Sequence, residues 1–373
     1  MMQRTQSRKV AIVHDWLVGG GAELVVEQLH KMYPDAPIYT SYATREWRER
    51  LDGKVHTGWL QPLGFIRKFI PFLRIWWFTH LDLSDYDLVI SSSGAEAKGI
   101  RVPKDTVHIN YCHAPTHYYW SRYDEYMRRP GFGAFDWPAR IGLRLLVAPL
   151  RRWDYKAAQR PDFIIANSTH IQHEIKKYYG RDSSVIHPPV DMERFQKPEN
   201  RRLPRQGFLV SGRQTPYKRF DIAVEACNQV EELLTVIGDG PDHARLRKLA
   251  GHDITFLGRV SDQVVEHEFG SANAFIFPGL DDFGITPVEA MAAGTPVIAY
   301  KAGGALDYII PGKTGEFFTE QTPESLAAAL KDFKPERYSS PAISIFAERF
   351  SKENFQRHMT HYVQTALSKE VRR

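Results

Sequence analysis

The sequence has 373 residues, which is long for a single hydrophobic core and predicts two domains. Its hydrophobic share of 43% and charged share of 25% are ordinary for a folded globular protein, which excludes a disordered or fibrous chain. The formal net charge is +5, from 49 basic and 44 acidic side chains, and the excess is concentrated between Arg128 and Arg160.

Cysteine usage and hydropathy indicate where the protein works. Cys112 and Cys227 are the two cysteines of the sequence, and neither has metal-ligand spacing, so a reducing cytoplasm is expected rather than a disulfide framework. The first residues lead into a strand without the apolar core of a secretory signal, and no apolar run approaches the roughly 18 residues that cross a bilayer. We therefore expect a cytoplasmic protein that can touch a membrane without spanning it.

The chain begins with a strand, a glycine loop and a helix. Residues 10–13 are a buried apolar run, Gly20 and Gly21 follow, and a helix is expected over 22–33. Glycines let the backbone approach an anion at a helix start, so the loop has the geometry of a phosphate cradle, with a simple tight turn as the alternative. Leu24 stands where a dinucleotide fingerprint needs its third glycine, which argues against a nicotinamide dehydrogenase.

Residues 60–80 are unusual because aromatic and aliphatic side chains alternate with Arg67, Lys68 and Arg74. This profile is typical of a segment in a membrane interface, and an internal helix packed on the sheet is an equal alternative. The basic region 137–160 favours the membrane, because lysine and arginine are drawn to anionic headgroups. Nucleic acid explains this charge less well and is not an expected partner, since no recognised binding motif occurs.

Further strand-like runs continue an α/β pattern, and the run at 107–111 leads to His113. A lone histidine is more often structural than catalytic. His113, however, follows the carboxyl end of a strand and precedes the aromatic residues 118–120, where open parallel sheets bind ligands. The polar, proline-containing stretch 196–206 is expected to link the two domains.

The second half opens with a strand at 207–211, which presents Arg213 and then Lys218 ahead of a helix. Cations at the carboxyl end of a parallel strand are costly to bury and usually face an anion or solvent. An exposed position on the helix surface is the alternative interpretation of Lys218.

The stretch 278–300 organises this half, because an apolar run, a glycine-containing loop, a short helix and a second apolar run together describe a βαβ unit. Thr286 fits an N-cap, Pro287 fits the first helical position, and Glu289 follows Thr286 with capping-box spacing. Gly294 is expected to end the helix.

Glu289 has a second interpretation. The free N–H groups of Ile285 and its neighbours form an anion site at the helix start, while Asp281 and Glu289 place two carboxylates at its rim. Carboxylates repel phosphate but accept hydrogen bonds from sugar hydroxyls. The combination suits a sugar nucleotide.

Asp281 and Glu289, separated by seven residues, stand in Asp-Asp-Phe-Gly-Ile-Thr-Pro-Val-Glu-Ala-Met-Ala-Ala-Gly-Thr-Pro-Val, which closely resembles the signature of the retaining GT-B glycosyltransferases of family four. The neighbourhood Pro-Gly-Leu-Asp-Asp-Phe-Gly-Ile resembles the bacterial mannosyltransferases that build O-antigen and other surface polysaccharides. The family usually has glutamate at the first acidic position, where this chain has the shorter Asp281. The glycine loop, histidine segment and Arg/Lys pair precede these carboxylates in the family's order.

The resemblance implies an α/β protein of the GT-B type, with two Rossmann-like doubly wound domains that face a cleft. The acceptor domain is expected over 1–195, the nucleotide-sugar donor domain over 196–345, and a C-terminal helix that crosses back over 346–373. The implied reaction is retaining transfer of a hexose, with mannose from GDP-mannose as the expected donor, to a lipid-linked glycan at the anionic inner face of the cytoplasmic membrane. A UDP-sugar donor and a non-catalytic nucleotide-sugar-binding scaffold stay open as alternatives.

The resemblance also assigns roles to residues, without a metal ion or other cofactor. His113 would position the donor sugar, Asp281 would accept hydrogen bonds from its hydroxyls, and Glu289 would accept them from the ribose. The other implied contacts are, for the diphosphate, Arg213, Lys218, Gly20 and Gly21; for the sugar loop, Phe283, Gly284, Ile285 and Thr286; and for the base, Arg259 and Val260.

Overall fold

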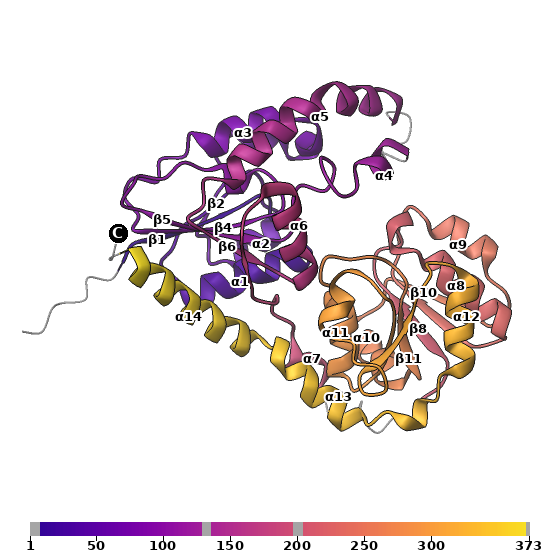
Figure 1. Cartoon of the computed structure of the whole chain (residues 1–373). Coiled ribbons are helices and arrows are strands. Elements are labelled where there is room, and N and C mark those ends of the chain that lie inside the picture. The colour runs from indigo at the N-terminus through magenta and orange to yellow at the C-terminus, as the bar shows by residue number, and fades with distance from the viewer. Residues whose placement is uncertain (1–7, 129–135, 197–203, 371–373) are drawn as a thin grey trace, which may run out of the picture. The chain divides into compact units, whose positions relative to one another are not determined.

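The structure is a computed structural model that describes residues 8–128, 136–196 and 204–370, without the side chains of 67–69 and 370. The chain divides into two compact units, residues 1–188 with 356–373 and residues 189–355. Each unit contains a parallel sheet with helices on its faces (Figure 1). This confirms the predicted α/β fold with two Rossmann-like domains.

The first unit is built on a sheet of seven strands within the described ranges, in the order β3-β2-β1-β4-β5-β6-β7, and all neighbours are parallel. The order reverses between β1 and β4, and ligands bind at the carboxyl ends of the strands at such a reversal in open α/β sheets. The strands are β1 (Val10–His14), β2 (Ile38–Thr40), β3 (Val55–His56), β4 (Leu88–Ser93), β5 (Val107–Cys112), β6 (Phe163–Ala166) and β7 (Ser184–Val185).

Helices cover both faces of this sheet. In Figure 1, α3 and α5 lie on one side of it, and α1 and α14 lie on the other. The central strands are therefore buried on both faces, which is why they read as continuous apolar runs in the sequence. The helices are α1 (Gly21–Met32), α2 (Arg45–Arg50), α3 (Pro71–Thr79), α4 (Tyr123–Arg128), α5 (Asp136–Ala158), α6 (Thr169–Tyr179) and α14 (Lys352–Glu370).

The second unit contains a six-stranded parallel sheet over its described residues, in the order β10-β9-β8-β11-β12-β13, and this order reverses between β8 and β11. Its strands are β8 (Phe208–Ser211), β9 (Leu234–Ile237), β10 (Ile254–Gly258), β11 (Ala274–Phe277), β12 (Val297–Tyr300) and β13 (Gly315–Phe318). Its helices are α7 (Met192–Phe195), α8 (Phe220–Val230), α9 (His243–Leu249), α10 (Asp262–Ser271), α11 (Ile285–Ala292), α12 (Pro323–Asp332) and α13 (Ser340–Ala347).

The units divide at different residues from those expected. The sequence placed the boundary after residue 195, but α7 packs on α10 and α11 with the side chains of Met192 and Phe195 in the second core, so this unit begins at 189. The expected linker falls largely on residues 197–203, which lie outside the described residues.

The end of the chain belongs to both units. The helix expected from residue 346 is instead α13, a short 3₁₀ turn and then α14, which begins at Lys352. From Gln356 onward α14 is part of the first unit, where the Gln356 side chain donates to Gln28 Oε1 at 2.8 Å and the Tyr362 ring meets Phe163 edge-on.

The aromatic and basic segment 60–80 has one face inside the first unit. Arg74 on α3 is 1% exposed and donates two hydrogen bonds to the equally buried Glu96, at 2.6 and 3.0 Å. Trp77 and Phe78 are buried in the same core. Because an unpaired buried charge is strongly destabilising, the pair fixes α3 to the loop after β4 and supports the internal interpretation for this face.

A second buried ion pair holds the same loop. Lys98 Nζ lies 2.7 Å from Asp154 Oδ1 on α5, and both side chains are almost fully buried. Asp15, the residue after β1, accepts hydrogen bonds from the backbone N–H groups of Gly94, Ala95 and Ala97 at 2.7–2.9 Å. The loop after β4 is therefore held from β1, α3 and α5 by carboxylates and cations that local sequence patterns do not pair.

Candidate functional site

Two predicted site residues meet at the strand reversal of the second sheet. Lys218 lies in the loop after β8 and Asp281 in the loop after β11, and their Nζ and Oδ2 atoms are 2.9 Å apart. Both side chains are mostly buried, at 18% and 16% exposed. Both residues lie where expected, at the carboxyl edge of the sheet, and the ion pair between them was not predicted.

The loops around this pair pack too closely for side chains at their glycines. A Cβ on Gly304 would lie 2.3 Å from the Phe283 backbone, and one on Gly279 would lie 3.0 Å from the Lys218 backbone. The Gly304 N–H also donates to the Asp281 carbonyl at 3.0 Å. These contacts join the loops after β8, β11 and β12, so the position of Asp281 is fixed by its backbone as well as by its ion pair.

The start of α11 differs from the expected capping box. The helix begins at Ile285, and its N-cap is Gly284, in a left-handed conformation with φ of 85° and without a side-chain cap. Thr286 is therefore inside the first turn, and the capping interpretation of Glu289 is wrong. Gly294 follows the helix with φ of 85°, which confirms the predicted stop.

The two residues before Ile285 have structural roles. Phe283 is 3% exposed and packs against Tyr308 and Phe350, so its side chain belongs to the core rather than to a ligand surface. A Cβ on Gly284 would lie 2.8 Å from both the Phe277 ring and the Tyr308 hydroxyl. Only glycine fits this backbone conformation, so the first N–H groups of α11 receive no cap from the side chain of residue 284.

Glu289 lies on α11 with its carboxylate in a desolvated position. Burial raises its pKa to about 7, Arg194 opposes the shift, and Asp191 and Asp262 add to it. No hydrogen bond from the described residues reaches the carboxylate oxygens. A carboxyl group that titrates near neutral pH and has hydrogen-bonding capacity to spare is typical of functional sites.

The remaining predicted residues of this unit are not brought into contact with the Lys218–Asp281 pair. Arg213 follows β8 and is exposed, and among the described residues no ion pair holds it. Arg259 is exposed after the carboxyl end of β10, at the edge of the sheet, and Val260 packs partly against the core. All three lie on loops at the same sheet edge as Lys218.

In the first unit, His113 lies just beyond β5 at the carboxyl edge of the sheet. Its Nε2 atom is 2.7 Å from Ser92 Oγ on β4, and its carbonyl accepts a hydrogen bond from the Asn167 side chain at 2.9 Å. The ring is partly exposed and lies near the rings of Tyr111 and His14. Sequence reasoning missed His14 and Ser92, although His14 ends a buried strand at the same edge.

The glycine loop carries its own carboxylate. Gly20 is the N-cap of α1, and Glu23 in the first turn accepts hydrogen bonds from the N–H groups of Val18 and Gly19, at 3.2 and 3.0 Å. A negative charge therefore already lies at this helix start. The predicted contact of Gly20 and Gly21 with a diphosphate requires the ligand to bind beside Glu23 or to displace it.

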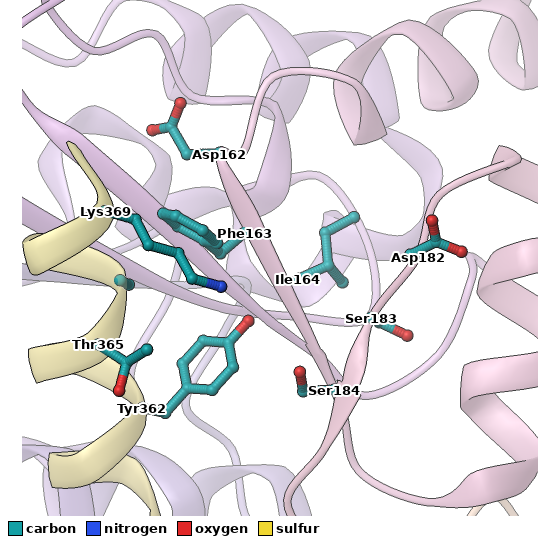
Figure 2. A pocket seen from close by; sticks show the side chains of 10 residues that line it. Asp162, Phe163, Ile164, Asp182, Ser183, Ser184, Tyr362, Thr365 and Lys369 are labelled. Atoms are coloured by element: carbon teal, nitrogen blue, oxygen red, sulfur yellow. The ribbon is translucent and has the colours of Figure 1, made fainter. Parts of the chain in front are cut away.

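A separate hollow of about 230 Å³ lies between α14 and strands β6 and β7 of the first unit. Figure 2 shows Tyr362 and Lys369 of α14 facing Asp162 and Asp182 across it. The lining includes the first residues of β6 and β7, so the hollow opens at the amino ends of the strands. It contains no predicted site residue and lies at the opposite sheet edge from His113.

Comparison with known families covers most of the chain. Residues 19–194 match the profile described as Glycosyltransferase Family 4, and residues 191–356 match the profile described as Glycosyl transferases group 1. The chain belongs to the family 4 glycosyltransferases. The two profiles meet where the two structural units meet, so both halves of this glycosyltransferase are accounted for.

Its relatives include two named mannosyltransferases. The alpha-1,3/1,6-mannosyltransferase alg2 of Schizosaccharomyces pombe is 24% identical over 82% of this chain and 70% of its own length. A GDP-mannose-dependent alpha-(1-6)-phosphatidylinositol dimannoside mannosyltransferase of Mycobacterium tuberculosis is 32% identical over 46% of this chain and 47% of its own. The chain spans about half the length of the first curated relatives it matches.

Solved structures show the same fold. The crystal structure of Anabaena Alr3699/HepE in complex with UDP superposes with a TM-score of 0.69 at 18% identity, and covers 96% of this chain and 100% of that one. At this identity the likeness establishes the GT-B fold of the glycosyltransferase and no more.

Proposed function

We propose that this protein transfers mannose from GDP-mannose, with retention of anomeric configuration, to a lipid-linked glycan acceptor in surface polysaccharide synthesis. The observation that carries the proposal is the Lys218–Asp281 pair at the strand reversal of the second sheet, in a chain of the family 4 glycosyltransferases. Two relatives named as mannosyltransferases support mannose as the sugar, and one of them is named as GDP-mannose-dependent.

The mechanism stabilises the charge that grows on the leaving diphosphate as the glycosidic bond breaks. Lys218, Arg213 and the N–H groups at the start of α11 supply fixed positive charge without a metal ion. Asp281 accepts hydrogen bonds from the donor sugar hydroxyls, and Glu289 accepts them from the ribose. The leaving phosphate takes the proton of the acceptor hydroxyl.

His113, the glycine loop and the backbone at 259–260 complete the proposed donor contacts. His113 orients the donor sugar, Gly20 and Gly21 approach the diphosphate, and the backbone around Arg259 and Val260 borders the base. Neutral His113 has one donor and one acceptor nitrogen, which suits a hydroxyl.

The donor base is tested by ligand-induced stabilisation. A nucleotide that binds only the folded protein raises the unfolding temperature, and we expect GDP to raise it by about 5 °C at a hundredfold excess over its Kd, with UDP giving less. Mass spectrometry of reactions with GDP-mannose and a lipid-linked acceptor mixture then checks transfer. A larger rise in unfolding temperature with UDP would indicate a UDP-sugar donor in place of GDP-mannose. Nucleotide binding without donor hydrolysis or transfer would indicate a non-catalytic scaffold.

The membrane part of the proposal rests on α5. Trp137, Ile141 and Leu145 are 71%, 42% and 72% exposed, and their i, i+4, i+8 spacing places them on one stripe of the helix. Exposed basic side chains flank the stripe: Arg140, Arg144, Arg152 and Lys156. An outward apolar stripe with basic flanks suits the interface of an anionic membrane, where the apolar side chains enter the headgroup region.

The basic region contributes to this surface only in part. Asp154 and Arg160 are turned inward, to Lys98 and to the Gly99 carbonyl, and Arg129 lies outside the described residues. Segment 60–80 adds three exposed aromatic side chains, Phe65, Phe72 and Trp76. The last two are on α3, which lies on the same side of the sheet as α5 (Figure 1). No helix within the described ranges is both long enough and apolar enough to span a bilayer.

Flotation with anionic vesicles tests this surface. We expect the wild-type protein to float at low salt, and the double variant Trp137→Glu/Leu145→Glu to bind roughly tenfold less, because it loses buried apolar area and adds repelled charge. Leu233→Glu, at a 51% exposed leucine of the second unit, is the matched control and should float as the wild type does. Equal flotation of the double variant, or none by the wild type, would refute the membrane surface.

A further inference from the structure

His14 lies at the strand reversal of the first sheet. It is the last residue of β1 and pairs in register with Ser92 of β4, the strand on the other side of the reversal. Its side chain is 3% exposed, and its ring lies edge-on to that of His113 with centroids 6.2 Å apart. Two imidazoles therefore stand together where open α/β sheets bind their ligands.

Ser92 fixes both imidazoles. His14 Nδ1 is 2.7 Å from the Ser92 carbonyl, and His113 Nε2 is 2.7 Å from the Ser92 hydroxyl. A carbonyl oxygen only accepts hydrogen bonds, so His14 Nδ1 must carry a proton and donate it. In the neutral ring the lone pair is then on Nε2, and the ring orientation is set by the backbone of β4.

The Nε2 atom of His14 makes no hydrogen bond with the described residues. Some polar atoms of the protein lack a partner and are fully enclosed, but His14 Nε2 is not among them. His30 and His108 each have such an enclosed ring nitrogen. The Nε2 atom of His14 is therefore not fully enclosed, although the residue as a whole is only 3% exposed. A fixed, accessible lone pair at this edge is suited to a hydroxyl donor.

We propose that His14 Nε2 accepts a hydrogen bond from a hydroxyl of the glycan acceptor, and that Ser92 is the positioning residue for both imidazoles. The inference rests on the proposed function, which assigns His113 and the glycine loop of this edge to the donor and gives His14 no role. His14 binds the acceptor and takes no proton from it, because the leaving phosphate does so.

Two substitutions of His14 distinguish the contributions of its two ring nitrogens. In His14→Asn the side-chain amide falls near the Nδ1 position and can still donate to the Ser92 carbonyl, but nothing replaces Nε2. In His14→Gln the amide reaches the Nε2 position instead. We expect His14→Asn to raise the acceptor KM about five- to tenfold and to leave the donor KM and acceptor-free donor hydrolysis unchanged, with partial recovery in His14→Gln.

His30→Asn, at a buried imidazole of α1 away from this sheet edge, is the control and should keep the wild-type acceptor KM. Nitrogen NMR of the wild-type protein gives a readout apart from activity, since neutral His14 should show its proton on Nδ1. An unchanged acceptor KM in His14→Asn, equal rises in both KM values, or a proton on Nε2 would overturn the inference alone. Absence of transfer by the wild-type protein would overturn the proposed function and this inference with it.

Discussion

Replacing Lys218 by alanine is expected to lower kcat/KM for transfer by about 10²- to 10³-fold while the protein stays folded. The Lys218 ammonium is the cation held at the strand reversal of the second sheet, 2.9 Å from Asp281. In the proposed mechanism its removal takes away charge that stabilises the departing diphosphate. It also leaves the mostly buried Asp281 carboxylate without its cation. Steady-state kinetics with GDP-mannose, together with thermal unfolding, measure both effects.

Two further variants separate the loss of charge from the loss of structure. Lys218→Ala/Asp281→Asn removes the ion pair without leaving an unpaired carboxylate, so it should recover unfolding temperature but not transfer. Lys331→Ala, at an exposed lysine in the last turn of α12, should match the wild type in both measurements. Near wild-type turnover in Lys218→Ala would remove Lys218 from the mechanism.

Glu289→Gln is expected to stabilise the protein at pH 8 while lowering kcat/KM for transfer by about 10²-fold. In the proposed mechanism the ionised carboxylate accepts hydrogen bonds from both ribose hydroxyls, whereas the amide has one acceptor oxygen and two donor hydrogens. The same carboxylate is held in a desolvated position, which opposes its ionisation. We therefore expect ionised Glu289 to favour nucleotide binding and to lower the stability of the folded protein.

The pH dependence of this effect follows from the raised pKa of Glu289, about 7 against an ordinary 4.5. Between these values the folded protein holds a proton that the unfolded chain has released, so stability falls as pH rises from about 4.5 to 7 and is then level. After allowance for partial exposure, this loss is about 2 kcal/mol. The Glu289→Gln variant should not show this loss of stability with rising pH. Near pH 5 its free energy of unfolding should equal that of the wild type.

Denaturant unfolding at pH 5 and pH 8 checks this prediction, with nucleotide affinity measured on the same samples. Glu324→Gln, at an exposed glutamate in the first turn of α12, serves as the control and should keep the pH dependence of the wild type. If Glu289→Gln and Glu324→Gln showed the same dependence of stability on pH, the folded protein would not raise the pKa of Glu289. Binding of nucleotide should also tighten from pH 6 to pH 8, as the carboxyl group ionises.

Several features of the candidate site were predictable from the chain alone because they depend on neighbouring residues. Buried parallel strands appear as short apolar runs, and the residues after their carboxyl ends fall at one sheet edge, which is how His113, Lys218 and Asp281 could be named. The stop at Gly294 was likewise a local signal. The family signature added the order of these segments and hence the pair of Rossmann-like domains.

The helix cap and the roles of single charges were not predictable in this way. Thr286 has N-cap chemistry, but Gly284 takes the position because the loop packs against Phe277 and Tyr308 too tightly for a Cβ. Arg74 belongs to a segment with the composition of a membrane interface, yet its side chain pairs with Glu96 inside the first unit. A local pattern specifies which residues are polar and leaves open which partner each will meet.

The sequence by itself determined the two α/β units, the segments that end at their ligand-binding edges and membership of the family 4 glycosyltransferases. Tertiary structure alone decided that Lys218 meets Asp281 across 63 residues, that Ser92 holds His14 and His113, and that burial raises the pKa of Glu289. The physical reason is that strand and loop positions follow from residues adjacent in the chain. Ion pairs, imidazole tautomers and desolvation depend on atoms that only folding brings together.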